Sequence, residues 1–327
     1  MIAWIRGRGF LLAILLAVGG ALLWPQLGAR GGPLATEWSV PLVIFCIFLL
    51  QGLSLPTRKL LAGGGNARIH AFVHLWCYLG YPALAFLLIV AAGPLLAPAA
   101  TAGLIFLAIL PSTIFSALGC TQAAGGNTAA ALVNTVSTNL IGVIAVPLLA
   151  MLLLQLDSFA VSDPLATIRR LALLILFPLV LGQLVRNFWR KRAESLSRHH
   201  TMLSNAGIVF IIFAAVADSI SGGYWQSVGG SYLLQVSLAA LALLALSHLL
   251  IALSLPWVGR AREDRIAAFF CASQKTLATG IPMAIAIFSD AGTAGLIVIP
   301  LILYHPLQLV VAAFVVQWLQ SPAVPSS

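Results

Sequence analysis

The residues best suited to chemistry surround one lysine in an otherwise uncharged apolar stretch. Lys275 lies near the middle of Ile266–Phe288, IAAFFCASQKTLATGIPMAIAIF, which is long enough to cross a bilayer. A charge at that depth is costly unless it is paired, faces a watery cavity or loses its proton. Its neighbours Ser273, Gln274, Thr276, Thr279, Gly280 and Pro282 are polar or weaken a helix. Such backbone is tolerated in a membrane only where protein or a cavity covers it, so the pattern predicts a transport site.

A second polar interruption lies in the apolar run 101–122. Pro111 lacks an amide hydrogen and breaks or kinks a helix, and Ser112, Thr113 and Ser116 follow it. Their hydroxyls can satisfy freed backbone groups or offer oxygens to an ion. A broken helix also places one partly positive and one partly negative helix end at mid-membrane. We predict an ion or substrate site here, with hydrogen bonds that merely stabilise helices as the alternative for each hydroxyl.

The run 128–154 carries a third group of polar side chains. Asn134 and Thr138 are four residues apart and share a helix face, with Thr135 and Ser137 nearby. Facing lipid would be costly, so we expect this stripe to face the protein interior, either for binding or for helix packing. The candidate substrate- or ion-binding residues are therefore Ser112, Thr113, Ser116, Asn134, Thr135, Thr138, Ser273, Gln274, Lys275 and Thr276.

The composition sets the class of protein that positions these residues. Apolar residues make up 61% of the 327-residue chain and charged residues 8%, whereas soluble domains average roughly 25% charged residues. The mean hydropathy is +1.05. The long continuous runs predict an all-α integral membrane protein, because barrel strands would alternate in short segments. The net charge of +9 sits in short loops, which favours membrane orientation over nucleic-acid binding.

Apolar runs bounded by charge, Gly and Pro predict about ten transmembrane helices. They lie near 9–27, 38–55, 70–92, 101–122, 128–154, 168–188, 202–220, 231–255, 266–288 and 292–318. Arg6 and Arg8 precede the first run, which we interpret as a first span rather than a signal peptide. With the N-terminus inside, the cytoplasmic segments hold Arg6, Arg8, Arg58, Lys59, Arg68, Arg186, Arg190, Lys191, Arg192, Arg198, Arg260, Arg262 and Arg265. The opposite side holds Arg30, Arg169, Arg170, Glu37, Asp157, Asp163 and Asp290. This asymmetry predicts a cell inner-membrane protein with both termini cytoplasmic.

The chain is predicted to divide into two halves of five helices, 1–160 and 161–327. An odd number of spans gives the halves opposite orientations, which is the inverted-repeat architecture of many secondary transporters. Each half carries its polar interruption in the fourth of its five spans. About 16 residues later a short turn follows, at 125–127 in one half and at 290–292 in the other. Paired interruptions in corresponding spans point to a central binding site formed by discontinuous helices four and nine.

Two stretches carry a resemblance to a known family. Residues 126–138, GNTAAALVNTVST, and residues 272–278, ASQKTLA, resemble the fifth and ninth helices of the bile acid:sodium symporter family. The motif SQKTL is most similar to a bacterial branch of this family. That branch is related to a divergent vertebrate member that has been linked to calcium handling. The resemblance covers most of the chain and implies ten helices. A panel of helices one, two, six and seven would rock against a core of the others, in which helices four and nine cross. It also implies sodium ions behind the crossing and an organic anion between panel and core.

The sequence departs from that family at the expected sodium ligands. The resemblance implies an acidic residue where this chain has Phe270, and amides where it has Lys275 and Ala117. Gln274, Ser116 and Thr135 still match. We hypothesise that the Lys275 ammonium replaces a sodium ion at the crossing, and that burial of this charge could permit proton coupling. In a second form of the hypothesis, Lys275 attracts an anionic substrate directly.

These observations predict a secondary active transporter of a small, organic, anionic solute that works by alternating access. Sodium or a proton is the possible coupling ion, and we expect no other cofactor and no nucleic-acid partner. One alternative is a cation/proton antiporter on the same crossed-helix architecture, although no Asp or Glu lies deep in a predicted span. Another is a non-transporting membrane regulator of ion homeostasis. An enzyme is not expected, because Ser, His and Asp never occur at suggestive spacing. The substrate and the oligomeric state are open.

Overall fold

The computed structural model describes residues 2–54, 66–154, 165, 169–170, 172–188, 199–224, 226, 230–288 and 291–320. Every regular element in these ranges is helical. Six helical segments are long and apolar enough to cross a membrane: 36–54, 67–95, 128–153, 200–221, 232–258 and 293–320. The pair α7 (Pro98–Ile109) and α8 (Ile114–Ala123), bent by 56°, adds a seventh. The helical membrane class is confirmed. Ten spans in inverted halves remain a prediction, and the predicted boundary near 160 lies outside the described residues.

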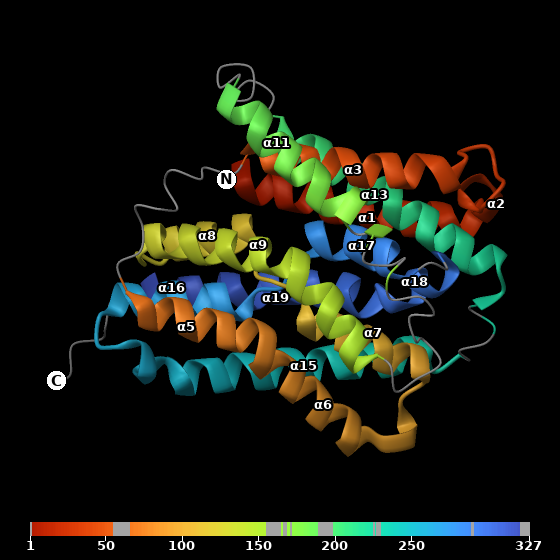
Figure 1. Cartoon of the computed structure of the whole chain (residues 1–327). Helices are drawn as coiled ribbons and strands as arrows, with labels where there is room; N and C mark the ends of the chain where they lie inside the picture. The colour runs from red at the N-terminus through yellow and green to blue at the C-terminus, as the bar shows by residue number, and fades with distance from the viewer. Residues whose placement is uncertain are drawn as a thin grey trace.

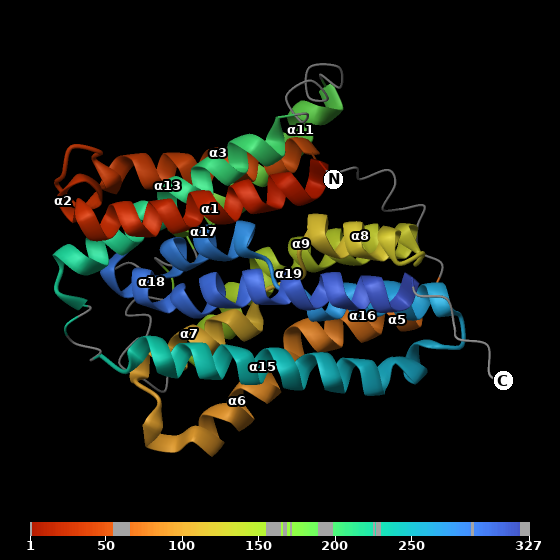
Figure 2. The ribbon, with the colours of Figure 1, turned by 180° about the vertical axis from the view of Figure 1, so that it is seen from behind.

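The helices form two layers, which Figure 1 and the reverse view in Figure 2 both show. We call the first layer the panel: α1 (Ile2–Leu23), α3 (Thr36–Ser54), α11 (Phe177–Phe188) and α13 (His200–Ser221). We call the second layer the core: α5 (Ala67–Leu75), α6 (Tyr81–Ala92), α7, α8, α9 (Thr128–Leu153), α15 (Tyr232–Ser254), α16 (Arg262–Ser273), α17 (Leu277–Ile287), α18 (Ala291–Ile297) and α19 (Ile299–Gln320). The short elements are α2 (Pro25–Gly28), η1 (Trp76–Gly80), η2 (Gly93–Leu95), η3 (Ala172–Leu176) and η4 (Leu255–Val258).

The two layers meet mainly where α13 packs against α17 and α18. Gly295 of α18 lies against the backbone of α13, and a Cβ at this position would overlap the carbonyl oxygen of Ala215. The two helices therefore approach as closely as they do because position 295 has no side chain. Small residues at such contacts are typical of helix pairs within membranes.

A single carboxylate joins the starts of three core helices. Asn66 caps α5 and Asn127 caps α9, and each side-chain oxygen accepts a backbone N–H of its own helix. Both side-chain amides also donate to Asp264, at 2.9 Å from Asn66 and 2.8 Å from Asn127. Asp264 lies in the first turn of α16, where a negative charge complements the helix dipole. These bonds fix the start of α16, whose other end enters the site described below.

Two predicted boundaries in the second half of the chain need correction. The ninth span was expected to begin at 266, but α16 begins at Arg262 because its charged first turn is stabilised by the caps around Asp264. The tenth run, 292–318, agrees with the apolar helical segment 293–320, in which a turn at Val298 separates α18 from α19. Of the predicted turn at 290–292, Asp290 lies outside the described residues and Ala291 already begins α18.

Substitution of Gly182 should destabilise the panel. Gly52 of α3 and Gly182 of α11 face each other, and a Cβ on Gly182 would overlap the carbonyl oxygen of Leu49. Because backbone cannot yield like a flexible side chain, Gly182→Ala should lower the free energy of unfolding by about 1–3 kcal/mol. Gly119→Ala is the control, since a Cβ there meets no atom within 4 Å on an exposed helix face. It should raise stability by about 0.5–1 kcal/mol. Equal thermal unfolding of the two variants would contradict this packing.

Candidate ion and substrate site at the helix crossing

The first break, between α7 and α8, is made by Pro111. The residue before a proline is pushed out of the α conformation, and Leu110 is extended, with φ −69° and ψ 149°. The helix resumes at Ile114 after Thr113, which is also extended. Local covalent chemistry is therefore sufficient to explain why this helix stops where the sequence predicts an interruption.

The second break, between α16 and α17, contains no proline and is held open by neighbouring groups. Gln274 and Thr276 are extended, with ψ values of 130° and 124°. The Thr276 amide donates to the carbonyl oxygen of Pro111 at 3.1 Å. The Gln308 side chain of α19 accepts the Lys275 amide at 2.7 Å and donates to the Lys275 carbonyl at 2.8 Å. The two breaks thus cross in contact, and Gln308 pairs with the second break much as a neighbouring β-strand would.

The Lys275 ammonium is fully buried at this crossing. It donates to the carbonyl oxygens of Leu110 at 2.6 Å, Ala108 at 2.8 Å and Cys77 at 3.2 Å. Its nitrogen also lies 4.0 Å from the centre of the Tyr81 ring, within the range of a cation–π contact. Three acceptors require three N–H donors, which an ammonium has and a neutral amine lacks. The geometry is therefore that of a positively charged lysine.

The three carbonyls are available because of where they sit in the backbone. Ala108 and Leu110 lie at the C-terminal end of α7, where carbonyls lack intrahelical partners and the helix dipole favours a cation. Cys77 lies in the π-helical turn η1, in which the Tyr81 amide bonds to the Trp76 carbonyl rather than to that of Cys77. The next possible donor is Pro82, which has no amide hydrogen. The Cys77 carbonyl is thus left for Lys275. We call these three oxygens the carbonyl cage.

Other predicted residues complete the crossing. The Ser116 hydroxyl donates to Gln274 Oε1 at 2.6 Å, which joins α8 to the second break. The carbonyl of Ser112 accepts Asn139 Nδ2 at 2.6 Å, and that of Ser273 accepts the Tyr81 hydroxyl at 2.8 Å. Ser112 Oγ, Ser273 Oγ and Gln274 Nε2 are buried without a hydrogen-bond partner in the described residues. The crossing therefore retains polar groups that a bound ion or solute could use.

The remaining candidate residues form hydrogen bonds mainly with groups three or four positions away in the chain. Thr135 and Thr138 donate to carbonyls of α9 itself, at 2.9 Å and 3.0 Å. Asn134 donates to the Ala130 carbonyl and lies 3.1 Å from a ring nitrogen of His70. The Thr276 hydroxyl accepts from the Thr279 amide at the start of α17. For Thr135, Thr138 and Asn134, the structure thus shows helix stabilisation and packing, and it gives Thr113 no hydroxyl bond among the described residues.

Sequence reasoning missed several residues at this site, chiefly Gln308, Tyr81 and Cys77. Gln308 was visible as an amide in the apolar run 292–318, and its full burial marks it as a paired group. The Cys77 carbonyl had a fainter signal, the Pro82 that follows it by five residues. In the described ranges, no group of three or more His, Cys, Asp or Glu residues could hold a metal ion. The backbone carbonyls at the two breaks, together with the Ser112 and Ser273 hydroxyls that lack a partner among the described residues, are cation-binding groups at the crossing.

Comparison with known proteins gives a consistent assignment. A model of the SBF-like CPA transporter family matches residues 8–321. An uncharacterized protein of Pseudomonas aeruginosa is 31% identical over 311 residues, covering 94% of this chain and 91% of that protein. The mouse protein named sodium/bile acid cotransporter 7 is 28% identical over 335 residues, covering 97% and 93%. Its Danio rerio counterpart of the same name is 29% identical over 328 residues, covering 96% and 94%.

Proposed function

Because this chain belongs to the SBF-like CPA transporter family, we propose that it is a secondary active transporter of a small organic anion. It works by alternating access in the inner membrane, with ten helices in two inverted halves and both termini in the cytoplasm. The relatives from mouse and Danio rerio are named sodium/bile acid cotransporter 7. Bile acids are organic anions, so these names support an anionic solute. The observation that carries the mechanism is the buried Lys275 ammonium in its carbonyl cage.

The arrangement of panel and core supports alternating access. The main packing between them is limited to α13 on α17 and α18, so the panel can tilt about this contact without unpacking the crossing. The breaks themselves lie wholly within the core, between α7–α8 and α16–α17. A rigid crossing and a movable panel are the parts that rocking-type transport requires.

Lys275 acts in this proposal as a built-in cation. Unwound backbone carbonyls at half-helix ends are the groups that hold sodium in broken-helix transporters, and here the ammonium occupies three of them. Phe270, at the position where the resemblance implies an acidic ligand, is fully buried. Since all three N–H groups already have acceptors and no surface is exposed, the geometry supports a fixed charge more than direct attraction of the substrate.

The cation/proton antiporter is the second candidate, and the structure favours it less. Such a mechanism needs an acidic group that exchanges a proton and a cation inside the membrane. In the described part of the chain, the fully buried polar side chains include Lys275, Gln274 and Asn134 but no Asp or Glu. A non-transporting regulator has no specific observation in its favour.

The stability of the purified protein should depend on an organic anion and not on sodium. A ligand that binds only the native state at about 100 times its Kd stabilises it by roughly 2.7 kcal/mol. We expect at least one member of a panel of organic anions to raise the melting temperature equally in sodium and potassium buffers. Choline chloride at the same ionic strength is the control for salt effects. Stabilisation that requires sodium would refute the built-in cation, and uptake into proteoliposomes by the same anion would then test transport.

A further inference from the structure

Three polar pairs join α5 and η1 to α9 at intervals of about one helical turn. They are His70 with Asn134, His74 with Ser137, and Tyr78 with the carbonyl of Thr138. We call these six residues the polar ladder. It begins one turn beyond Asn66, at the end of α5 that the sequence predicts to be cytoplasmic. It ends at the first break, since a Cβ on Gly142 would lie 3.0 Å from both the Tyr78 hydroxyl oxygen and the Pro111 side chain.

His74 has hydrogen-bond partners that suit two protonation states. Its Nδ1 lies 2.7 Å from the His70 carbonyl oxygen, which only accepts, so Nδ1 carries a hydrogen in both states. In the neutral ring, Nε2 accepts from the Ser137 hydroxyl at 3.2 Å. In the charged ring, Nε2 donates to Ser137 Oγ, and the hydroxyl turns to the Asn134 carbonyl, also at 3.2 Å. A proton can therefore bind when a single hydroxyl rotates.

His248 of α15 has the same first hydrogen bond without the second. Its Nδ1 lies 2.8 Å from the Leu244 carbonyl, four residues earlier in the helix, as in His74. Its Nε2 is buried and has no hydrogen-bond partner among the described residues. The ring lies edge-on to Phe269 at 5.7 Å. A proton on this nitrogen would be a buried donor without an acceptor, which is costly, so the acceptor at Ser137 distinguishes His74.

Two other buried basic groups are less suited to exchange a proton. Loss of a proton from Lys275 would leave three carbonyl acceptors with only two N–H donors. His305 Nδ1 lies 2.8 Å from Gln308 Nε2, which is a donor, so a proton on this His305 nitrogen would oppose another hydrogen. The contacts of both groups thus favour one protonation state.

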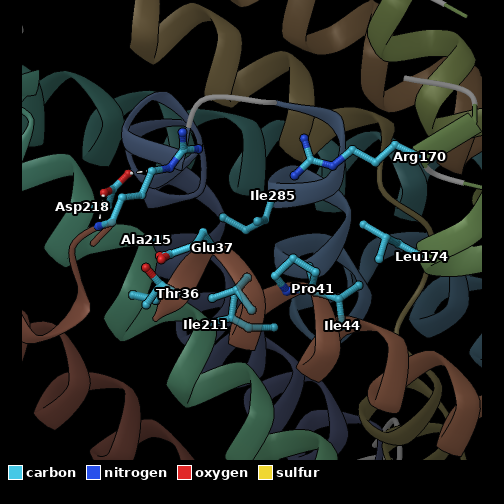
Figure 3. Close-up of a pocket in the computed structure, with 13 residues that line it drawn as sticks. Thr36, Glu37, Pro41, Ile44, Arg170, Leu174, Ile211, Ala215, Asp218 and Ile285 are labelled. Carbon is cyan, nitrogen blue, oxygen red and sulfur yellow. Dashed lines mark hydrogen bonds and ion pairs between the residues drawn. The ribbon is translucent and has the colours of Figure 1, made fainter. Parts of the chain in front are cut away.

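The acidic side chains of the described residues lie near helix ends and outside the ladder. Asp264 accepts from the two capping asparagines, and Glu263 beside it is exposed. Glu37 accepts the backbone amide of Gly31, and Asp218 accepts that of Arg30. Figure 3 shows Glu37 and Asp218 on one side of a cavity between panel and core. His74 is therefore the titratable group whose contacts within the core permit a proton to come and go.

The surroundings of His74 leave an added charge without a counterion. The titratable groups on its own helix and on the elements packed against it are, from α5, Arg68 and His70; from η1, Cys77 and Tyr78; and, from α16, Cys271 and the charged first turn at 262–265. The ring of Tyr78 lies 6.4 Å from that of His74, while α9 and η4 contain no titratable side chain. Within the described part of the chain, no carboxylate bonds to His74, so a bound proton adds a positive charge to the core.

This added charge links proton binding to anion binding. Lys275 already holds a positive charge at the Cys77 carbonyl, about one turn beyond His74. Two positive charges in the core repel each other, and a bound anion relieves that repulsion. The proton and the anion therefore raise each other's affinity, because such coupling is reciprocal.

We infer that His74 binds the coupling proton of transport. One proton joins Nε2 when a solute anion binds and leaves when the anion leaves, so that a monoanion and a proton cross together without net charge. This inference rests on the proposed transport function, and it names the coupling ion and the residue that carries it.

Nitrogen-15 NMR of labelled histidine side chains tests the proton site directly. The full-length native protein is titrated in an uncharged maltoside detergent, and His74→Gln identifies the His74 signals. We expect His74 Nε2 to become protonated between about pH 8 and pH 5, the range in which histidine ordinarily titrates. His248 should stay neutral throughout.

Ser137→Ala should weaken proton binding at His74 about ten-fold, since the imidazolium loses its second acceptor. Ser237→Ala is the matched control on α15, where the Ser237 hydroxyl donates to the Leu233 carbonyl. It should leave the titration of His74 unchanged. A purely structural role of Ser137 would change the stability of the protein and not this titration.

Uptake of taurocholate into proteoliposomes tests the coupling. Taurocholate is a bile acid, the solute in the names of the mouse and Danio rerio relatives, and its sulfonate stays ionised across this pH range. With one proton per anion, an outside pH lower by one unit should concentrate it about ten-fold inside, equally in sodium and potassium. His74→Gln should lose this accumulation.

Two results would overturn the proton site: His74 keeps one protonation state from about pH 5 to pH 8, or Ser137→Ala and Ser237→Ala titrate alike. Taurocholate uptake that a sodium gradient drives and a pH gradient does not would reject the coupling role and leave the transport function intact. If His74 titrates as expected but taurocholate does not move under any gradient, that result counts against the proposed function, and the proton site stands.

Discussion

Replacement of Lys275 by alanine should destabilise the protein by about 3 kcal/mol or more, because three buried carbonyl oxygens lose their hydrogen-bond donor. The carbonyl oxygens of Leu110, Ala108 and Cys77 would lose their shared donor inside the core. An orphaned buried acceptor costs about 1–3 kcal/mol. The variant also avoids the desolvation of an ammonium, which limits the net loss. Destabilisation should win because the three carbonyls remain buried after the charge has gone.

A small cation should restore part of the stability that Lys275→Ala loses. n-Propylammonium has the same chain of atoms that the substitution removes, so it can place an ammonium in the carbonyl cage again. We expect it to raise the melting temperature of Lys275→Ala and to leave the native protein unchanged. n-Propanol, which fills space without a charge, should have little effect. Sodium should also stabilise the variant if the cage is a cation site of the kind that backbone carbonyls form.

Arg68→Ala is the matched control for loss of a positive charge. Arg68 lies on the exposed surface near the start of α5, where a surface substitution usually changes stability by less than about 0.5 kcal/mol. A melting temperature of Lys275→Ala equal to that of Arg68→Ala would show that the cage does not depend on the ammonium. Equal rescue by propanol and by propylammonium would show that the site needs volume rather than charge.

The sequence predicted those features of the site that depend on the chemistry of a single residue. Pro111 has no amide hydrogen wherever it lies, so the first break could be predicted from one residue. Lys275 could be recognised because a charge in an apolar run needs a partner whatever the fold. The pairing of Ser116 with Gln274, across the two interruptions, agrees with the prediction that they meet. These features follow from covalent structure and from the cost of charge in a membrane.

The partners that complete the site could not be predicted in the same way. The Cys77 carbonyl lies 198 positions from Lys275 in the chain, and it is free only because η1 is a π-turn followed by Pro82. Hydropathy depends on side chains, so it does not indicate which backbone carbonyl a turn leaves without a hydrogen-bond donor. The hydroxyls of Thr135 and Thr138 show the reverse case. Each hydroxyl donates to a carbonyl of α9, a local bond that a polar pattern does not reveal, and its role in binding stays a prediction.

Gln308→Met should cost roughly 2–6 kcal/mol of stability, since two buried backbone groups of Lys275 lose their partners at about 1–3 kcal/mol each. The Gln308 side chain is fully buried, and it supplies both an acceptor and a donor to the second break. Methionine has a similar length and volume, so a packing defect is kept small. Gln122→Met, on the exposed end of α8, is the control for the same change without burial.

The effect of Gln308→Met should be confined to the second break, because the first is fixed by Pro111 and not by a side chain. Amide hydrogen exchange should therefore accelerate in peptides covering 272–278 and remain slow in those covering 104–109, within α7. A general loss of core packing would accelerate both. If exchange at 272–278 were unchanged and stability fell by less than about 1 kcal/mol, the extended backbone around Lys275 would be stable without Gln308. The second break would then be held by its other hydrogen bonds, from the Thr276 amide to the Pro111 carbonyl and from Ser116 to Gln274.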